Sequence, residues 1–230
     1  MAETRAEGAT ILQLADWRRR VAELYAEVRQ LARTDPAAAH GHWRRERERL
    51  YREHPQSPLP PEGRTAFRAS HFPYDPRLRF ELPLLPPGDE LGGPAAAPSE
   101  EPHGAGPASM VALLPVSAGA ERRFDRVARL ALPLPGQPRL ALYRLREYAG
   151  GLFLPFRDGT NGGRTYGAGR YVLDTAKGAD LGAGSTPGTI VVDLNFAFQP
   201  SCAFDPRWAC PLAPTENTLG LEIRAGECLT

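Results

Sequence analysis

The chain of 230 residues is predicted to be mainly β, an antiparallel barrel or sandwich of about eight strands preceded by an α-helical hairpin. Over the first part of the sequence, apolar residues recur at spacings of three and four, as on one face of a helix. Later segments are short, alternate in polarity and are separated by glycine and proline. No helical pattern intervenes between them, which disfavours a parallel β/α architecture.

The helical hairpin is expected within residues 1–60, packed on a β domain formed by residues 61–230. Asp35 and Pro36 are expected to separate the two helices, as the N-cap and first residue of the second helix. That helix then ends at His54. The apolar stripe of the first helix consists of Leu14, Trp17, Val21, Leu24, Val28 and Leu31. It docks onto the β core, onto another partner, or onto a second copy, which would form a homodimer through the N-terminal helix.

Eight segments are predicted to be strands, namely residues 78–84, 110–116, 122–132, 139–147, 152–156, 169–174, 189–198 and 219–224. The segments 122–132 and 139–147 show the alternation of half-buried strands most clearly. Residues 86–109 contain almost no large apolar side chain. They cannot bury enough surface to offset their ordering entropy, and we expect a mobile loop between two strands.

Charge and hydropathy exclude several classes of partner. Lys and Arg total 28 against 27 Asp and Glu, so the formal net charge of +1 gives no global field for attracting nucleic acid or an anionic membrane. No apolar run approaches the ~20 residues that span a bilayer, and the N-terminus lacks the apolar core of a secretory signal. A cytoplasmic location is therefore expected. Three cysteines, an odd number, argue against a disulfide framework.

A Gly- and Arg-rich motif spans residues 156–171. Its glycines permit a tight loop whose backbone approaches a ligand, and its arginines can present forked donors to a carboxylate or phosphate. An anionic small molecule is therefore the predicted ligand. The motif is not a Walker A loop, because it lacks Gly-Lys-Ser/Thr and opens no helix. Alternatively, Arg157 pairs with Asp158 or Asp174 in a purely structural hairpin loop, and Tyr166 caps the core.

Asp193 and Asn195 lie two apart on a predicted strand, so their side chains share one face. If that face lines the mouth of a barrel, Asp193 is the natural general base and Tyr166 the acid. Alternatively, Asp193 is a buried carboxylate neutralised by an arginine. All five histidines precede Met110, which weakens a Ser-His or Cys-His prediction. The predicted catalytic residues are Asp193 and Tyr166, and the predicted ligand-binding residues are Arg157, Asp158, Thr160, Arg164, Arg170 and Asn195.

Cys202 and Cys210 are separated by seven residues, with Pro206 and Pro211 fixing the turn between them. Zinc would need four nitrogen or sulfur ligands at short spacings, and no second cysteine pair or histidine is near, so no metal is expected. Packed thiols are the simplest interpretation; a disulfide, or a reactive thiol beside Arg207, is the alternative. We expect the two side chains to approach one another, although they need not bond.

Five motifs resemble a known family. They are Leu-Pro-Phe-Arg-Asp, Thr-Tyr-Gly-Ala-Gly-Arg-Tyr, Asp-Leu-Asn-Phe-Ala-Phe, Cys-Pro-Leu-Ala-Pro-Thr-Glu-Asn and Ala-Gly-Glu, and the similarity extends to the N-terminal helix around Trp17. On these motifs the chain resembles the bacterial and archaeal family called domain of unknown function 1684. Asp193-Leu194-Asn195 and Phe198-Gln199-Pro200 depart from its more frequent Asp-Phe-Asn and Tyr-Asn-Pro patterns. The resemblance implies no activity.

Two functions therefore remain open. The chain is either a small-molecule enzyme, with hydrolase-like acid–base chemistry on an anionic metabolite bound under the Gly- and Arg-rich loop, or a non-catalytic ligand-binding or scaffold module. A flavin-binding barrel is a third hypothesis that rests on analogy of fold alone. The sequence assigns no cofactor.

Overall fold

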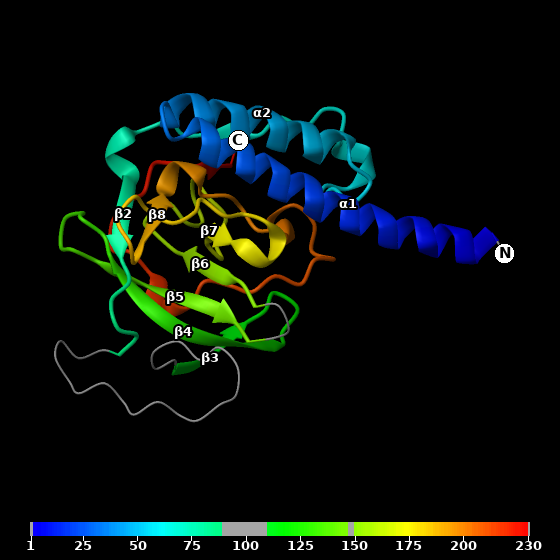
Figure 1. The fold of residues 1–230 in the computed structure, drawn as a ribbon. Helices are drawn as coiled ribbons and strands as arrows, with labels where there is room; N and C mark the ends of the chain where they lie inside the picture. The colour runs from blue at the N-terminus through cyan, green and yellow to red at the C-terminus, as the bar shows by residue number, and fades with distance from the viewer. Residues whose placement is uncertain (1, 89–109, 147–149, 230) are drawn as a thin grey trace.

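Two helices lie as one layer over a set of antiparallel β-sheets (Figure 1). The computed structural model describes residues 2–88, 110–146 and 150–229, and side chains from residue 9 onward. Most of the predicted loop at 86–109 therefore lies outside the described residues. The first helix begins well away from the sheets, and its N-terminal half projects past the rest of the chain.

The hairpin consists of α1 (Ala2–Leu31) and α2 (Pro36–Glu53). Asp35 caps α2 as predicted, since its side chain accepts a hydrogen bond from the backbone N of Ala38 at 2.9 Å. The hairpin contributes Leu24, Tyr25, Val28, Ala39, Trp43 and Leu50 to the same core as the strands. The middle of the apolar stripe thus docks onto the β core, whereas its two ends, Leu14 and Leu31, are exposed.

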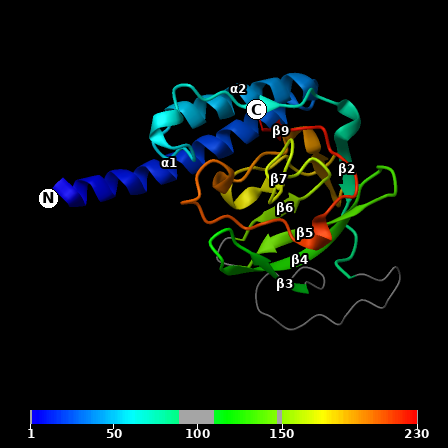
Figure 2. The ribbon, with the colours of Figure 1, turned by 180° about the vertical axis from the view of Figure 1, so that it is seen from behind.

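The largest sheet has five antiparallel strands in the order β3-β4-β5-β6-β7. They are β3 (Met110–Pro115), β4 (Glu121–Ala131), β5 (Arg139–Leu145), β6 (Leu152–Phe156) and β7 (Arg170–Asp174). Two strand pairs complete the fold, β2 (Arg79–Pro83) with β8 (Thr189–Asp193) and β1 (Ser70–His71) with β9 (Glu227–Cys228), the last beneath the helices (Figure 2). The predicted class is confirmed as sandwich-like and mainly β; the sheets of the described residues do not close into a barrel.

Six predicted strands are confirmed to within two residues, and two predictions were wrong. The strand predicted at 189–198 ends at Asp193, because this side chain accepts a hydrogen bond from the backbone N of Asn195 at 3.0 Å and turns the chain into the 3-10 turn Leu194–Phe196. Residues 219–224 form no strand, and the pairing falls later, in β9.

Asn217 fills the gap where β5 and β6 separate. These strands pair only at Tyr143 and Arg144. Further along, the Asn217 side chain accepts from the backbone N of Ala141 at 2.8 Å and donates to the carbonyls of Ala141 at 2.9 Å and Pro155 at 2.7 Å. Its amide thus replaces a strand partner. Because the 3-10 turn Thr215–Asn217 packs on β5, this strand is buried throughout Leu140 to Tyr143 and not half-buried as predicted.

Candidate functional site

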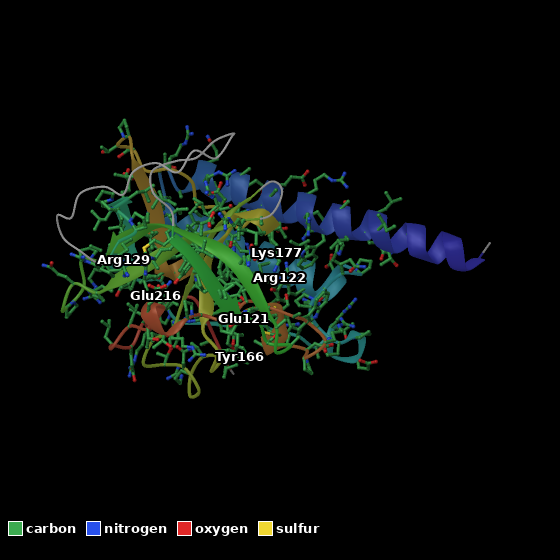
Figure 3. The ribbon with its side chains drawn as sticks, turned by 90° about the horizontal axis from the view of Figure 1, so that it is seen from below. Glu121, Arg122, Arg129, Tyr166, Lys177 and Glu216 are labelled. Carbon is green, nitrogen blue, oxygen red and sulfur yellow. The ribbon has the colours of Figure 1, made fainter. Side chains whose placement is uncertain are left out.

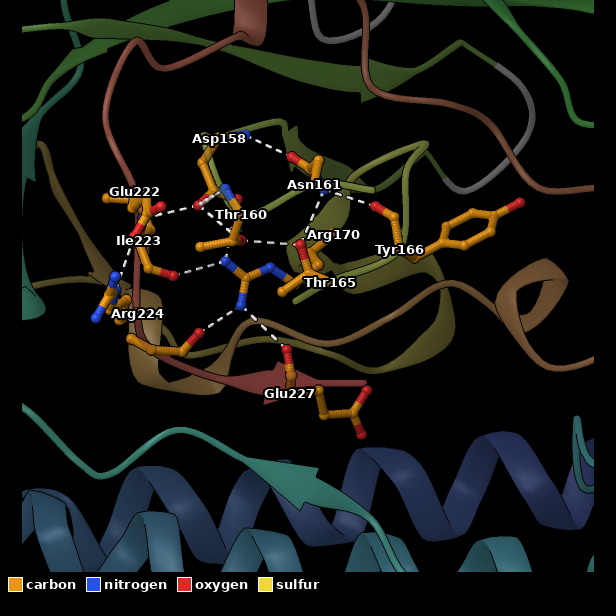
Figure 4. A network of polar contacts seen from close by, with 11 residues as sticks. Asp158, Thr160, Asn161, Thr165, Tyr166, Arg170, Glu222, Ile223, Arg224 and Glu227 are labelled. Atoms are coloured by element: carbon orange, nitrogen blue, oxygen red, sulfur yellow. Dashed lines mark hydrogen bonds and ion pairs between the residues drawn. The ribbon is translucent and has the colours of Figure 1, made fainter. Parts of the chain in front are cut away.

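Arg170 lies at the centre of a buried hydrogen-bond network within the Gly- and Arg-rich motif (Figure 4). Its Nη1 donates to the carbonyl oxygens of Ala225 and, at 3.1 Å, Glu227. Its Nη2 donates to the carbonyl oxygen of Ile223 at 2.9 Å and to Asp158 Oδ1 at 3.2 Å. Burial lowers the pKa of Arg170, and the Asp158 carboxylate opposes this shift. Both terminal nitrogens therefore contact acceptors of the protein itself.

Asp158 is the acceptor at the centre of the same network. Its Oδ2 accepts from the backbone N of Ile223 at 2.7 Å and from the hydroxyl of Thr160 at 2.9 Å. The Asn161 side chain accepts from the backbone N of Asp158 at 2.5 Å and so closes the loop from its other side. The polar side chains of this motif hold its own backbone and the C-terminal segment in place.

Asp193 and Asn195 form a second network, which joins the end of β8 to the segment before β2. Asp193 Oδ1 accepts from Asn195 Nδ2 at 2.8 Å, and Oδ2 accepts from Arg79 Nη1 at 3.3 Å. Asn195 also bonds the backbone N and the carbonyl of Asp75, each at 2.8 Å. Burial raises the pKa of Asp193, and the hydrogen bonds from Asn195 oppose this. This arrangement is the neutralised carboxylate considered above, with Arg79 as its partner.

The predicted site residues are therefore divided between two networks. The first holds Asp158, Thr160 and Arg170, and the second holds Asp193 and Asn195. In the described part of the chain, no side-chain hydrogen bond or ion pair joins the two. Arg164 is exposed over the ring of Phe72, and the Nε of Arg157 is buried without a hydrogen-bond partner. The binding and catalytic roles of these residues remain predictions.

Tyr166 connects the Gly- and Arg-rich motif with the cysteine segment, residues 202–210. Burial raises the pKa of the Tyr166 hydroxyl, and the Cys202 thiol adds to this shift. The prediction that the two cysteines approach one another is confirmed, and both are free thiols. The hydrogen bond from Cys210, with others from Tyr166 and Ser117, lowers the pKa of the Cys202 thiol to about 6 against the effect of burial.

A groove of about 550 Å³ opens between α1, β4, β6 and the 3-10 turn Thr175–Lys177. Its buried apolar lining includes Phe124 and Phe153, whose rings stack with centroids 5.2 Å apart. Its charged lining consists of Arg18, Arg122, Lys177 and Asp174. Ala209 and Pro211, beside the cysteine pair, form part of the wall. We call this the cationic groove; Figure 3 labels two of its lining residues, Arg122 and Lys177.

Among the described residues that line the cationic groove, three are cationic and one is a carboxylate. Lys177 Nζ lies 3.3 Å from Asp174 Oδ2, and this carboxylate raises the pKa of Lys177. An excess of cations over carboxylates in this described lining favours an anionic ligand. Sequence reasoning missed the site, because its cations come from three distant segments without a shared motif. The one available signal was that Lys177 is the only lysine of the chain.

The described residues contain no group of three or more His, Cys, Asp or Glu side chains that could hold a metal ion. Within the same residues, no helix is long and apolar enough to cross a bilayer. The flavin hypothesis stays a prediction.

Comparisons with known proteins identify relatives of unknown activity. The model of a family described as "Protein of unknown function (DUF1684)" matches residues 100–228. The chain has 30% sequence identity to an uncharacterized protein of Haloarcula marismortui whose structure was solved by solution NMR. The match covers 81% of this chain and 90% of that chain, with a TM-score of 0.53. A search of curated proteins gives no match. The similarities therefore bear on fold and ancestry and not on substrate.

Proposed function

The chain belongs to the DUF1684 family of proteins of unknown function, and we propose that it binds an anionic small molecule with an apolar portion in the cationic groove. The observation that carries this proposal is the convergence of Arg18, Arg122 and Lys177 around a lining of stacked aromatic rings. A largely apolar pocket with a few converging polar groups is typical of small-molecule sites.

The lining of the groove defines the ligand class. The rings of Phe124 and Phe153 and the side chain of Leu152 provide an apolar surface for a hydrocarbon or aromatic body. The guanidinium group of Arg18 can bind a carboxylate, sulfonate or phosphate through paired donors, and Arg122 adds a second positive charge to the lining. A carboxylate with an acyl chain or an aromatic ring meets both requirements.

Binding is better supported than hydrolase-like acid–base chemistry. Asp193 is hydrogen-bonded to Arg79 and Asn195, whereas the residue that influences the pKa of Tyr166 most, after burial, is Cys202, so the predicted base and acid have different neighbours. A general base must lie within hydrogen-bond reach of the proton it removes. Neither side chain lines the cationic groove.

The single lysine allows a direct test. An amine-reactive reagent can label only Lys177 and the N-terminal amine, which a peptide map distinguishes. Octanoate should slow labelling of Lys177 without slowing labelling of the N-terminal amine, and octanol, its uncharged analogue, should have a much smaller effect. Equal labelling of Lys177 with and without octanoate, up to the solubility limit of the probe, would refute the proposal.

Adjacent arginines supply matched control variants. On β4, Arg122 and Arg123 point to opposite faces, and only Arg122 lines the groove. Arg122→Gln should weaken octanoate binding about two- to fivefold, the effect of one partly exposed charge, whereas Arg123→Gln should leave it unchanged. On α1, Arg18→Gln and Arg19→Gln form a second such pair. Equal effects within both pairs would indicate general charge attraction and contradict a defined site.

A further inference from the structure

A small pocket of about 180 Å³ lies beside the pairing of β1 with β9. Its lining comes from three segments of the chain, residues 67–70, 199–204 and 227–229. Among the described residues, none lines both this pocket and the cationic groove. We call it the aromatic pocket, after the rings of Phe67 and Phe204 in its wall.

The wall of the aromatic pocket is suited to a single ring. The side chains of Phe67 and Phe204 meet edge to face, with ring centroids 5.9 Å apart and planes at 84°. The buried ring of Tyr51 contacts both, at 5.9 Å and 5.5 Å, and holds them in place. Ala69 and Ala203, also in the wall, carry small side chains that leave space for a ligand. A cavity of roughly 150 Å³ can hold one benzene ring, so the aromatic pocket has room for one six-membered ring with a substituent.

Gln199 provides a buried acceptor in the same wall. This residue is 4% exposed and lines the pocket. Its Oε1 atom is buried and has no hydrogen-bond partner among the described residues. The Nε2 atom donates to the carbonyl of Cys228 at 3.4 Å, which is long for a hydrogen bond. Because the amide is held this weakly, rotation about its last side-chain torsion can turn Oε1 toward the pocket, where a ligand can supply the missing donor.

The charges around the aromatic pocket favour a neutral ligand. The Glu227 side chain is 3% exposed, and its Oε1 lies 2.6 Å from Nε of Arg47, which neutralises the carboxylate. Its Oε2 accepts from Arg47 Nη2 at 3.3 Å and from the backbone N of Gln199 at 2.7 Å. Arg68 is exposed, and its Nη1 donates to the carbonyl of Phe67 at 2.8 Å. The described lining therefore leaves no buried charge for an ionic ligand to neutralise, and a buried ion without a partner is costly.

We propose that the aromatic pocket binds a neutral aromatic compound that carries one hydroxyl or amino group, a phenol or an aniline. The ring packs on Phe67 and Phe204, and the hydroxyl or amino group donates to Gln199 Oε1. A ligand without a donor would leave this acceptor unpaired. The site and its ligand class are independent of those proposed for the cationic groove.

Amide NMR spectra of the native protein test the site, with para-fluorophenol as the probe. We expect saturable shift changes at the backbone amides of residues 67–70 and 227–229, with a matching change in the fluorine signal of the probe. Octanoate should not displace the probe, because the described linings of the two sites do not overlap. Absence of saturable changes up to the solubility limit of the probe, or changes confined to other residues, would overturn the proposal.

Gln199→Met tests the hydrogen bond, since methionine keeps the length of the side chain without its acceptor. The comparison probe is para-fluorotoluene, in which a methyl group replaces the hydroxyl. The preference for para-fluorophenol, measured as the ratio of the two dissociation constants, should fall about two- to tenfold in Gln199→Met, the contribution of one hydrogen bond. It should be unchanged in Gln30→Met, at an exposed position of α1. The same ratio in Gln199→Met as in wild type would contradict the proposal.

Ala203→Leu keeps the proposal testable if Gln199→Met does not fold. The larger side chain fills the aromatic pocket, so both probes should lose binding, whereas Ala26→Leu, at an exposed position of α1, should bind them as wild type does. Cooperative thermal melts show that each variant is folded. Wild-type affinity for para-fluorophenol in folded Ala203→Leu would place the probe outside the pocket and sink the proposal.

Discussion

Replacing Arg170 with lysine should destabilise the protein by about 4 kcal/mol. Each of its two terminal nitrogens donates to two buried acceptors, Nη1 to the carbonyls of Ala225 and Glu227 and Nη2 to the carbonyl of Ile223 and to Asp158. A lysine ammonium can occupy the position of only one of these nitrogens. Two acceptors then lose their donor at about 1–3 kcal/mol each, which agrees with the ~3–5 kcal/mol typical of a broken buried ion pair.

Urea unfolding followed by tryptophan fluorescence measures this loss. Arg164→Lys is the matched control, because Arg164 lies in the same motif but is exposed, and its substitution should change the unfolding free energy by no more than about 0.5 kcal/mol. The stabilisation that octanoate gives should be the same in both variants. A loss below about 1 kcal/mol for Arg170→Lys would refute the structural role of its hydrogen bonds.

Two further predictions concern burial and backbone conformation. Burial lowers the pKa of His40 from 6.5 to about 4, so the unfolded chain takes up this proton first and stability should fall as pH decreases from about 6.5 to about 4. The loss approaches about 3 kcal/mol and should be absent from urea titrations of His40→Phe; an NMR titration of His40 near pH 6.5 would contradict it. Gly169→Ala should cost several kcal/mol more than Gly162→Ala in unfolding free energy, since both have positive φ but only at Gly169 would the added Cβ approach the Phe156 carbonyl to 2.6 Å. Equal losses would show that the loop shifts to make room.

Local patterns allowed most of the secondary structure to be predicted. The boundary at Asp35 depends on one side chain and its own helix, so it could be recognised from a few residues. The burial of β5 could not, because it depends on Asn217, which lies far away in the chain and bonds the backbone at Ala141. Alternating polarity along a strand predicts one buried and one exposed face. That prediction holds only where no distant segment covers the second face.

The Gly- and Arg-rich motif was predicted as a ligand site because its donors are the groups that bind carboxylates and phosphates. A buried backbone carbonyl needs a hydrogen-bond donor, as an anionic ligand does. Residues 219–226 form no strand in the described chain, and the carbonyls of Ile223 and Ala225 receive their hydrogen bonds from the Arg170 side chain. The sequence displays the donors but not the missing strand partners. A motif dense in polar residues therefore indicates unpaired backbone as readily as it indicates a ligand site. The two cases are distinguished only by whether its donors face protein carbonyls or an open groove.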